Sequence, residues 1–302
     1  MQEFNIKQLE QLTGIKAHTL RIWEKRYNLI TPDRTGGKHR SYSNEDLKHI
    51  LRVVYLYNKG IKISKIASLN EKEILHTMNT DLENGLRADE VLPGLMEACI
   101  DLDEKKIRRI LNKVESQFGL EQMIFKLIYP FLEKLGSAWV TGKVLPNNEH
   151  FISHIVSSTI ILATSRLKVE KAKAGDPVFL LFQPKGEWHE IPLLFIRYQL
   201  SKVGCKTVYF GSNVGFSAIT DYLSVKKVSH IYYHLITALG EQEPQQLMDE
   251  MALKYPEITI VASGPSVKEV NANYPNQILL KSQPEISDFI LQSVQKTTNS
   301  SF

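Results

Sequence analysis

The sequence predicts a chain of three domains, two of them helical and the last an α/β domain built on a doubly wound parallel sheet. Three observations support this prediction. Basic residues gather near the start of the chain, a glycine-poor stretch with apolar residues three and four apart follows, and the last part alternates short apolar runs with amphipathic segments. With 302 residues, the chain is long enough for two or three domains of ordinary size.

The composition excludes several classes of protein. Hydrophobic residues make up 43% of the chain and charged residues 23%, which is typical of a globular protein with sizeable cores. The longest apolar runs, such as 178–182, are far shorter than the roughly 20 residues that cross a bilayer, and the N-terminus has no signal-peptide pattern, so we expect a cytoplasmic protein. Cys99 and Cys205 lie far apart and lack CxxC spacing, which favours two buried thiols over a disulfide or a zinc site.

The net charge of +4 is distributed unevenly. Residues 1–70 contain 13 Lys and Arg against 6 Asp and Glu, a balance of +7, while the rest of the chain contains 24 against 27, a balance of −3. A small basic domain joined to a mildly acidic body is the charge pattern of a nucleic-acid-binding head on a sensing or assembly module. A solvated charged surface would have the same composition, so charge alone leaves both interpretations open.

The basic head is predicted to contain a helix, a tight turn, a second helix and a wing. Apolar residues over 4–12 follow a helical period, Thr13-Gly14-Ile15 marks a turn, and a second helix is predicted over 16–26. In that second helix Leu20 and Trp23 point inward, which leaves its cations free to reach the major groove and the phosphates. The stretch 32–42 is a glycine turn flanked by cations, as in a wing, and Ser43 is placed to cap the helix that follows.

Two runs in this head make a resemblance specific. Thr19-Leu20-Arg21-Ile22-Trp23-Glu24-Lys25-Arg26-Tyr27, followed by Arg40-Ser41-Tyr42-Ser43 and a helix over 46–57, resembles the winged helix-turn-helix of MerR-family regulators over nearly all of residues 1–70. The resemblance implies dimers that bind inverted-repeat double-stranded DNA. It also implies these DNA contacts: Thr19, Arg21, Tyr27, Arg40 and Tyr42, with Lys16 and His18 beside them. Trp23 is expected in the core.

The middle of the chain, residues 79–168, predicts a four-helix bundle because four segments repeat apolar residues at helical spacing. One group of residues could bind a ligand as well as pack: Trp139 is followed, after nine intervening residues, by the pair Glu149-His150. An indole can stack on a flat ligand, and the acid and the imidazole can form polar contacts with it. Taken alone, the three residues also fit a core tryptophan and two surface side chains.

The C-terminal part alternates strands and helices. Strands are predicted over 178–183, 207–210, 230–233, 258–262 and 277–280, with helices over 191–202, 216–225, 243–254 and 285–295. This repetition predicts a flavodoxin-like doubly wound parallel sheet, whose ligands bind at the carboxyl ends of the strands. No GxGxxG follows the first strand, which argues against a dinucleotide site.

The loop after the first of these strands contains Glu187-Trp188-His189. An acid two residues before a histidine can hydrogen-bond one ring nitrogen and leave the other to a metal. This segment resembles the acid-x-His segment of cobalamin-binding domains. With the bundle before it, essentially the whole chain resembles MerR-type, cobalamin-dependent photoreceptor regulators of the CarH and LitR type.

The resemblance implies roles for five residues. His189 would be the cobalt ligand and Glu187 its orienting partner, while Trp139, Glu149 and His150 would lie at the upper face of adenosylcobalamin. In the photoreceptor branch, light breaks the cobalt–carbon bond and the DNA-binding assembly falls apart. A ligand bound by only one state shifts the population toward that state, and its loss reverses the shift.

The sequence departs from the family pattern at three positions. Pro192 replaces a glycine, His234 lies in the segment where a serine is expected, and Ser263 replaces the first of two glycines. These small residues normally leave room for the nucleotide tail of cobalamin. Two interpretations therefore stay open: a regulator that senses a cobalamin, with or without light, and a regulator of the same architecture that has lost the cofactor and responds to another ligand or a partner protein.

The predicted domains are 1–72, 79–168 and 175–296, with assembly into a homo-oligomer, dimer or tetramer, through the bundle and the C-terminal domain. A third hypothesis is a cobalamin-dependent mutase or methyltransferase. Nothing that resembles a substrate domain remains in 302 residues beside the DNA-binding head, so the sequence predicts a protein that is not an enzyme.

Overall fold

The computed structural model describes residues 4–35, 39–84, 91–140, 146–168, 176–237 and 243–298. The chain separates into two compact units, residues 1–156 and 157–302. The boundary falls within helix α9 (Pro146–Ser165), so the first unit holds the basic head together with most of the helical middle. The predicted division into three domains stays a prediction. No helix in the described ranges is both long and apolar enough to span a membrane.

The head begins with two short helices joined by a glycine turn, as predicted. Helix α1 (Ile6–Thr13) starts with a capping box in which the Asn5 side chain accepts from the Gln8 amide and the Gln8 side chain accepts from the Asn5 amide. Gly14 ends the helix in the left-handed region, with φ of 76°, where a residue without a side chain is unstrained. Helix α2 (Ala17–Tyr27) follows at once.

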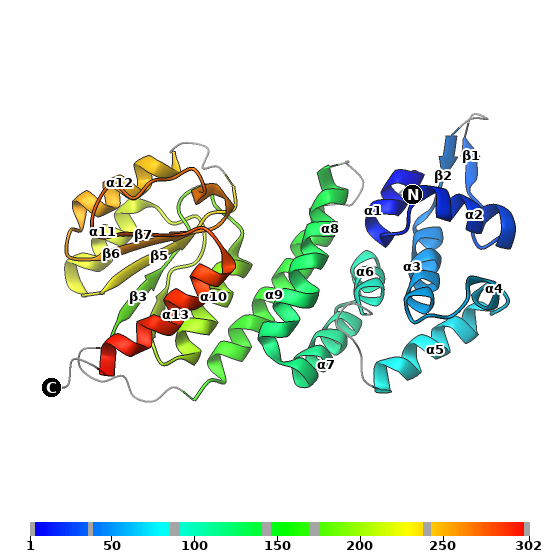
Figure 1. Ribbon diagram of the computed structural model, residues 1–302, viewed down its shortest axis with the longest axis horizontal. Coiled ribbons are helices and arrows are strands. Elements are labelled where there is room, and N and C mark those ends of the chain that lie inside the picture. The colour runs from blue at the N-terminus through cyan, green and yellow to red at the C-terminus, as the bar shows by residue number, and fades with distance from the viewer. Residues whose placement is uncertain are drawn as a thin grey trace. The chain divides into compact units, whose positions relative to one another are not determined.

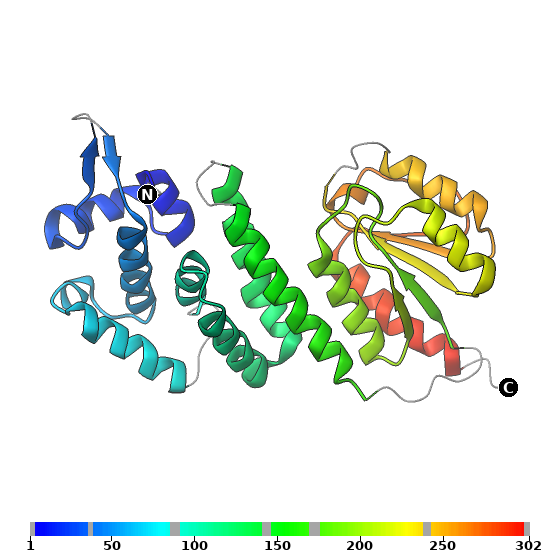
Figure 2. The same ribbon diagram turned by 180° about the vertical axis from the view of Figure 1, so that it is seen from behind.

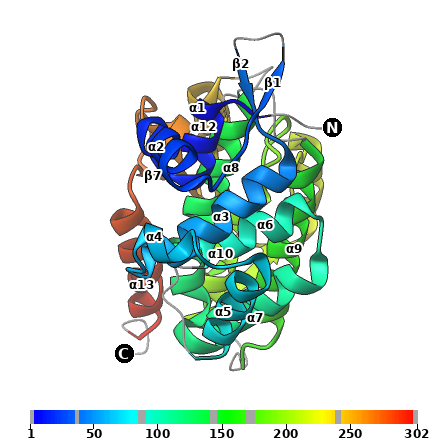
Figure 3. The ribbon, with the colours of Figure 1, turned by 90° about the vertical axis from the view of Figure 1, so that its right-hand side faces the viewer.

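The wing and the third helix complete the head. Strands β1 (Asp33–Thr35) and β2 (His39–Ser41) form an antiparallel hairpin that extends beyond α1 and α2 (Figures 1 and 3). Ser43 caps helix α3 (Asn44–Asn58) through a capping box with Asp46, which confirms the predicted cap. The short α4 (Ile63–Ile66) and the longer α5 (Glu71–Asn84) come next. Trp23 is 3% exposed, so it belongs to the core as expected.

The helical middle has the four expected helical segments. Helix α6 (Leu92–Ile100) is followed by α7 (Glu104–Met123), which is interrupted where Gly119 has a φ of 81°. A π-helical turn η2 (Ile124–Ile128) leads into α8 (Tyr129–Val140), and α9 completes the segment. Within the first unit, α3 of the head packs on α6 and α1 packs on α8.

The second unit is a five-stranded, all-parallel sheet in the order β4-β3-β5-β6-β7, which confirms the doubly wound fold (Figure 2). The strands are β3 (Val178–Leu181), β4 (Lys206–Tyr209), β5 (His230–His234), β6 (Thr259–Ser263) and β7 (Gln277–Leu280). The helices are α10 (Glu190–Lys202), α11 (Phe216–Val225), α12 (Pro244–Lys254) and α13 (Gln283–Thr298), and a 3-10 turn η3 (Pro265–Val267) follows β6.

Both faces of the sheet are covered, because the chain reverses the direction in which it adds strands once, after β4. Side chains from α10 and α13 pack with Phe179 and Leu181 on one face. Side chains from α11 and α12 pack with Leu180 and Phe182 on the other (Figures 1 and 2). Strand β3 pairs with β4 on one side and β5 on the other, so the chain reverses its winding there. The carboxyl ends of β3 and β5 are where this fold binds ligands.

Substitutions at two glycines of the second unit would distinguish the cost of backbone strain from the cost of steric overlap. Gly264 (φ 107°) follows β6, and a Cβ there would overlap the carbonyl oxygen of Leu235. Gly204 (φ 91°) has nothing within 4 Å of the same position. We expect Gly204→Ala to lower the free energy of unfolding by about 1–2 kcal/mol from strain alone, and Gly264→Ala to lower it by at least about 3 kcal/mol because a backbone carbonyl must also move.

Urea titrations of the full chain that follow thiol labelling of Cys205, which is buried in the second unit, measure both changes. An equal loss of unfolding free energy in the two variants would show that the Leu235 carbonyl can move at no energetic cost.

Candidate functional site

The outer surface of α2 carries most of the residues predicted to contact DNA. Lys16, His18 and Arg21 are exposed, and Thr19 and Tyr27 are half-buried. Leu20 and Trp23 are the buried residues of α2, and His18 and Arg21 project from the other side of the helix. Lys16 precedes the helix and Tyr27 is its last residue, and the wing extends from the same head (Figure 3).

Arg40 on β2 is held beside α2 by an ion pair. Its Nε donates to both carboxylate oxygens of Glu24, at 3.1 and 3.2 Å. Tyr42, two residues later, is 1% exposed, and burial together with the charge of Glu24 raises its pKa to about 12. Tyr42 is thus a core residue that supports the Glu24–Arg40 pair, and not a side chain presented to DNA in this conformation. Tyr42 lies just beyond β2 and its ring is buried, so its direct DNA contact stays a prediction that this burial does not support.

The second unit contains a buried carboxylate in the loop after β3. Glu187 is fully buried, and its Oε1 accepts from the His189 ring nitrogen Nδ1 at 2.6 Å. The same oxygen accepts from the backbone amides of Trp188 at 2.9 Å and His189 at 3.0 Å. The acid two residues before the histidine therefore holds that ring, as the sequence predicted.

The other oxygen of Glu187 reaches the loop after β5. Oε2 accepts from the backbone amides of Ile236 at 2.8 Å and Thr237 at 2.9 Å, and from the Thr237 hydroxyl at 3.2 Å. Burial alone would raise the pKa of Glu187, but hydrogen bonds from His189 and from these amides lower it to about 2. The carboxylate is therefore charged at neutral pH and joins the two loops at the point where the sheet reverses its winding.

His189 has the surroundings of a metal-binding imidazole. Its side chain is 49% exposed while its carboxylate partner is fully buried. Because Nδ1 bonds to Glu187, Nε2 is the ring nitrogen that would coordinate, and a carboxylate on the far nitrogen makes an imidazole more basic. The donor set thus fits a histidine that would bind a cobalt centre. Among the described residues there is no cluster of three or more His, Cys, Asp or Glu for a bare metal ion.

Two of the three positions that depart from the family pattern lie at the carboxyl ends of β5 and β6. His234 and Ser263 are register partners, and His234 Nδ1 lies 2.8 Å from the Ser263 hydroxyl, which also accepts from the Tyr232 hydroxyl at 2.9 Å. His234 is 8% exposed and Ser263 is fully buried. Side chains therefore fill the space where the resemblance expects small residues. Pro192 lies in the first turn of α10, where a proline is tolerated.

Two of the three residues predicted for the upper face lie at the start of α9. Glu149 accepts from the Ser153 hydroxyl at 2.7 Å, and His150 is 78% exposed with its Nδ1 3.4 Å from Glu149. Trp139 falls in the last turn of α8, but its side chain lies outside the described part of the structure. The assignment of these three residues to a cofactor stays a prediction.

Sequence reasoning missed Gln183, a fully buried residue just beyond β3. Its Nε2 donates to the His189 carbonyl at 2.6 Å, so it fixes the backbone of the loop that carries the imidazole. Its Oε1 is buried and has no hydrogen-bond partner among the residues that the structure describes. Only its place directly after a buried strand could have singled it out.

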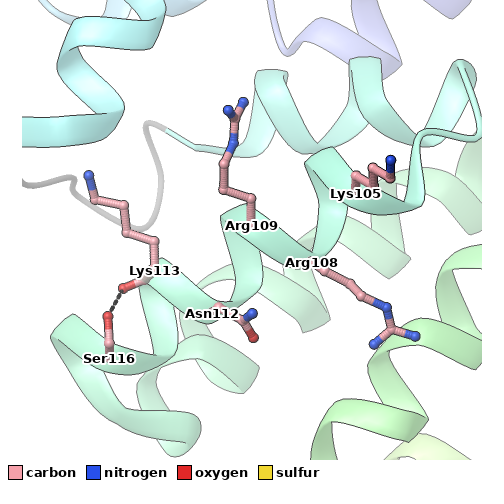
Figure 4. Close-up of a pocket in the computed structure, with 6 residues that line it drawn as sticks. All are labelled: Lys105, Arg108, Arg109, Asn112, Lys113 and Ser116. Carbon is pink, nitrogen blue, oxygen red and sulfur yellow. Dashed lines mark hydrogen bonds between the residues drawn. The ribbon is translucent and has the colours of Figure 1, made fainter.

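A second feature that the sequence did not single out is a cationic face on α7. A shallow depression there is lined by Lys105, Arg108, Arg109, Asn112, Lys113 and Ser116 (Figure 4). Arg108 donates to Glu104 at 2.7 Å, one helical turn away. The lining contains no acid, imidazole or thiol, so this face attracts anions but has no group for acid–base chemistry. Basic surface is therefore not confined to the head.

Comparison with known protein families identifies two segments. Residues 4–73 match the MerR HTH family of regulatory proteins, and residues 91–162 match a B12 binding domain. The first match covers the head from its first helix to the start of α5. The second covers α6 to α9, which is the segment that carries Glu149 and His150.

Several curated proteins are similar to this chain. The HTH-type transcriptional repressor CarH of Myxococcus xanthus is 22% identical over 218 residues, which are 70% of this chain and 71% of the repressor. The repressor CarA of the same organism is 21% identical over 87% of both chains. The HTH-type transcriptional regulator MlrA of Escherichia coli K12 is 33% identical, but only over 29% of this chain and 34% of its own length.

Among solved structures, the monomethylamine corrinoid protein of Methanosarcina barkeri superposes with a TM-score of 0.53 at 14% identity. The superposition covers 68% of this chain and 99% of the corrinoid protein. At this level of identity, the likeness shows a shared fold.

The buried His234 predicts how the stability of the second unit depends on pH. Burial lowers the pKa of His234 to about 4, an effect that the charge of Glu187 only partly offsets. Between pH 4 and 6.5 the unfolded chain therefore binds a proton that the folded chain does not, so the free energy of unfolding should fall as the pH falls through this window. Below about pH 4.5 the lowered pKa of Glu187 should continue the fall. Urea titrations at several pH values, read by Cys205 labelling, measure the slope.

His234→Gln keeps a hydrogen-bonding side chain beside Ser263 and removes the titrating ring. The variant should lose most of the slope. An unchanged slope would assign it to another group.

Proposed function

Because this chain combines a MerR-type helix-turn-helix with a B12 binding domain, we propose that it is a DNA-binding transcriptional regulator that senses a cobalamin. The observation that carries the sensing half is the Glu187–His189 pair, a charged buried carboxylate that holds an exposed imidazole at the carboxyl edge of a parallel sheet. CarH and CarA, which are similar over most of this chain, are named as transcriptional repressors.

The head would bind double-stranded DNA through α2 and the wing. Arg21 and Lys16 are exposed on α2, and Arg40 lies beside it through Glu24. Helix α2 has the size and exposure to enter a major groove, while the wing contacts the backbone. We propose that two heads of a homo-oligomer bind an inverted repeat, because one short helix reads only a few base pairs.

His189 would hold the cofactor through Nε2, with Glu187 fixing the ring and Gln183 fixing its backbone. A bound adenosylcobalamin supplies a cobalt–carbon bond that light can break. Trp139, Glu149 and His150 are our candidates for its upper face, and their types suit a stacking contact and polar contacts with an adenosyl group. The chain's own part is to bind and to orient, so we propose a sensor and not an enzyme.

One observation favours a second candidate function. His234 and Ser263 fill the space that the resemblance reserves for the nucleotide tail. A regulator of the same architecture that has lost cobalamin and responds to another ligand or a partner protein would need no such space. The spectrum described below separates the two functions.

DNA binding should depend steeply on salt, because each phosphate contact releases counterions. In the full-length protein, Arg21→Ala should weaken binding to a selected duplex about tenfold or more and should reduce the slope of log affinity against log salt by about one. Lys227→Ala, which removes an exposed cation of the second unit, is the matched control. Fluorescence anisotropy over a salt series measures both quantities, and equal binding by Arg21→Ala and the control would contradict the assignment of α2.

Cobalamin binding should change the absorption spectrum through His189. Protein mixed with adenosylcobalamin and passed through gel filtration should retain a spectrum that differs from that of the free cofactor, and green light should alter it. His189→Ala should lose this difference, while Glu187→Gln should weaken cofactor binding about 10- to 100-fold because the ring loses its partner. Elution of the wild-type protein without cofactor would contradict cobalamin sensing and favour the second candidate function.

A further inference from the structure

Residues 91–162, which match a B12 binding domain, are called the B12-binding segment below. Within the first unit, the head contacts this segment through charged groups as well as apolar ones. Arg52 of α3 donates to Glu97 of α6 through Nη2 at 2.6 Å and Nε at 3.2 Å. Glu97 is 3% exposed, and the Arg52 side chain is 13% exposed. Nearby, Lys48 of α3 donates to Asp101, just past α6, at 2.9 Å. Two cations of the head thus meet two carboxylates of the segment.

Three of these four charges have a second partner on their own side of the contact. Arg52 also pairs with Glu71 of the head. Glu97 also lies 3.3 Å from Lys106 of α7. Lys48 pairs with Glu45 within α3 at 2.7 Å, and the Asp101 side chain is 42% exposed.

These second partners matter because a buried charge that loses its only partner is strongly destabilising. Here, separation of the head from α6 would leave Arg52, Glu97 and Lys48 each paired locally and open to water. The ion pairs therefore favour contact without making separation prohibitive. This is the property of a reversible contact.

The apolar part of the same contact is tightly packed. One small cavity is lined from both sides of the contact, by Phe4, Leu12 and Leu47 of the head and by Met96, Cys99 and Leu135 of the segment. Cys99 is 1% exposed, and burial raises its pKa to about 12. A thiol in this position is unreactive while the head covers it, so it reports on the contact.

The contact extends to the predicted cofactor residues. Asn148, at the start of α9, donates through Nδ2 to the Cys99 carbonyl at 2.7 Å, and the Cys99 thiol lies 3.5 Å from the Asn148 carbonyl. Glu149 and His150 are the next two residues. The end of α6, which bears Glu97, is therefore fixed to the helix turn that carries two of the candidate cofactor ligands.

We propose that Arg52, Glu97 and Asn148 are positioning residues that dock the DNA-binding head reversibly on the B12-binding segment, and that docking fixes the spacing between the two heads of an assembled regulator. Docking uses α1 and α3, and α2 stays exposed, so the docked head is open to DNA. A head on a fixed base reaches one half-site spacing, whereas a tethered head reaches many. This inference rests on the proposed function for its DNA consequence but not for the docking itself.

The first test labels Cys99 in the full-length protein with a thiol reagent. Arg52→Gln should raise the Cys99 labelling rate about tenfold or more, because a charged hydrogen bond that favours the closed state is lost. Arg52→Lys should restore slow labelling in large part, and Cys205 in the second unit should be unaffected. Arg109→Gln, which removes a cation from the exposed face of α7, is the matched control.

Circular dichroism shows whether Arg52→Gln keeps its helices. If it does not, Glu97→Gln makes the same test from the other side, since Arg52 keeps Glu71. Cys99 labelling at the wild-type rate in a folded Arg52→Gln or Glu97→Gln variant would overturn the docking.

The second test uses a duplex that the full-length protein selects from a random library, and the same duplex with about half a helical turn, about five base pairs, inserted between its half-sites. The insertion should weaken wild-type binding about 100-fold or more and should weaken Arg52→Gln binding less than about tenfold. Equal ratios in both proteins, or wild-type binding that ignores spacing, would overturn the role in spacing. Absence of any DNA binding would instead refute the proposed function, and Cys99 labelling would still decide the docking.

Discussion

The loops at the carboxyl edge of the parallel sheet depend on one buried carboxylate. Glu187 accepts hydrogen bonds from the loop after β3 with one oxygen and from the loop after β5 with the other. These loops meet where the sheet reverses its winding, so without a bridging anion several backbone amides would lack a partner. The amides and the imidazole keep the carboxylate charged, and the charged carboxylate orients the imidazole. The conformation of the loops and the chemistry of His189 therefore follow from the same set of bonds.

The first unit uses charge in a different way. In the second unit a single carboxylate has all its partners nearby and holds one arrangement. At the contact between head and segment, Arg52, Glu97 and Lys48 have one partner across the contact and another on their own side. Charges satisfied in two ways permit two arrangements, and a regulator requires two states whose balance an effector can change.

The space beside Glu187 distinguishes this chain from the pattern it resembles. His234 and Ser263 bond to each other with Tyr232 and occupy the carboxyl ends of β5 and β6. The histidine is kept neutral by burial, so it fills space without adding charge near Glu187. The acid and the histidine of the loop after β3 stand as in the pattern that the sequence resembles, while the neighbouring space does not.

Much of the fold could be predicted because it rests on local rules. The Ser43 cap, the glycine turn at Gly14 and the places of the strands along the chain follow from side-chain and backbone preferences that act over a few residues. The pair Glu187-His189 was also within reach, since two residues apart in one loop is a local relation. The burial of Tyr42 was not within reach, because only the packing of the hairpin on the head decides whether the side chain just beyond β2 turns inward.

The sequence by itself thus determined the helix-turn-helix, the helical middle, the parallel sheet and the histidine with its acid. Only the tertiary structure decided that Glu187 also bonds to Ile236 and Thr237, that His234 pairs with Ser263, and that Arg52 meets Glu97. These contacts join residues 29 to 50 positions apart. The physical reason is that the chain path between such residues is set by the packing of whole elements, which no short stretch of sequence encodes.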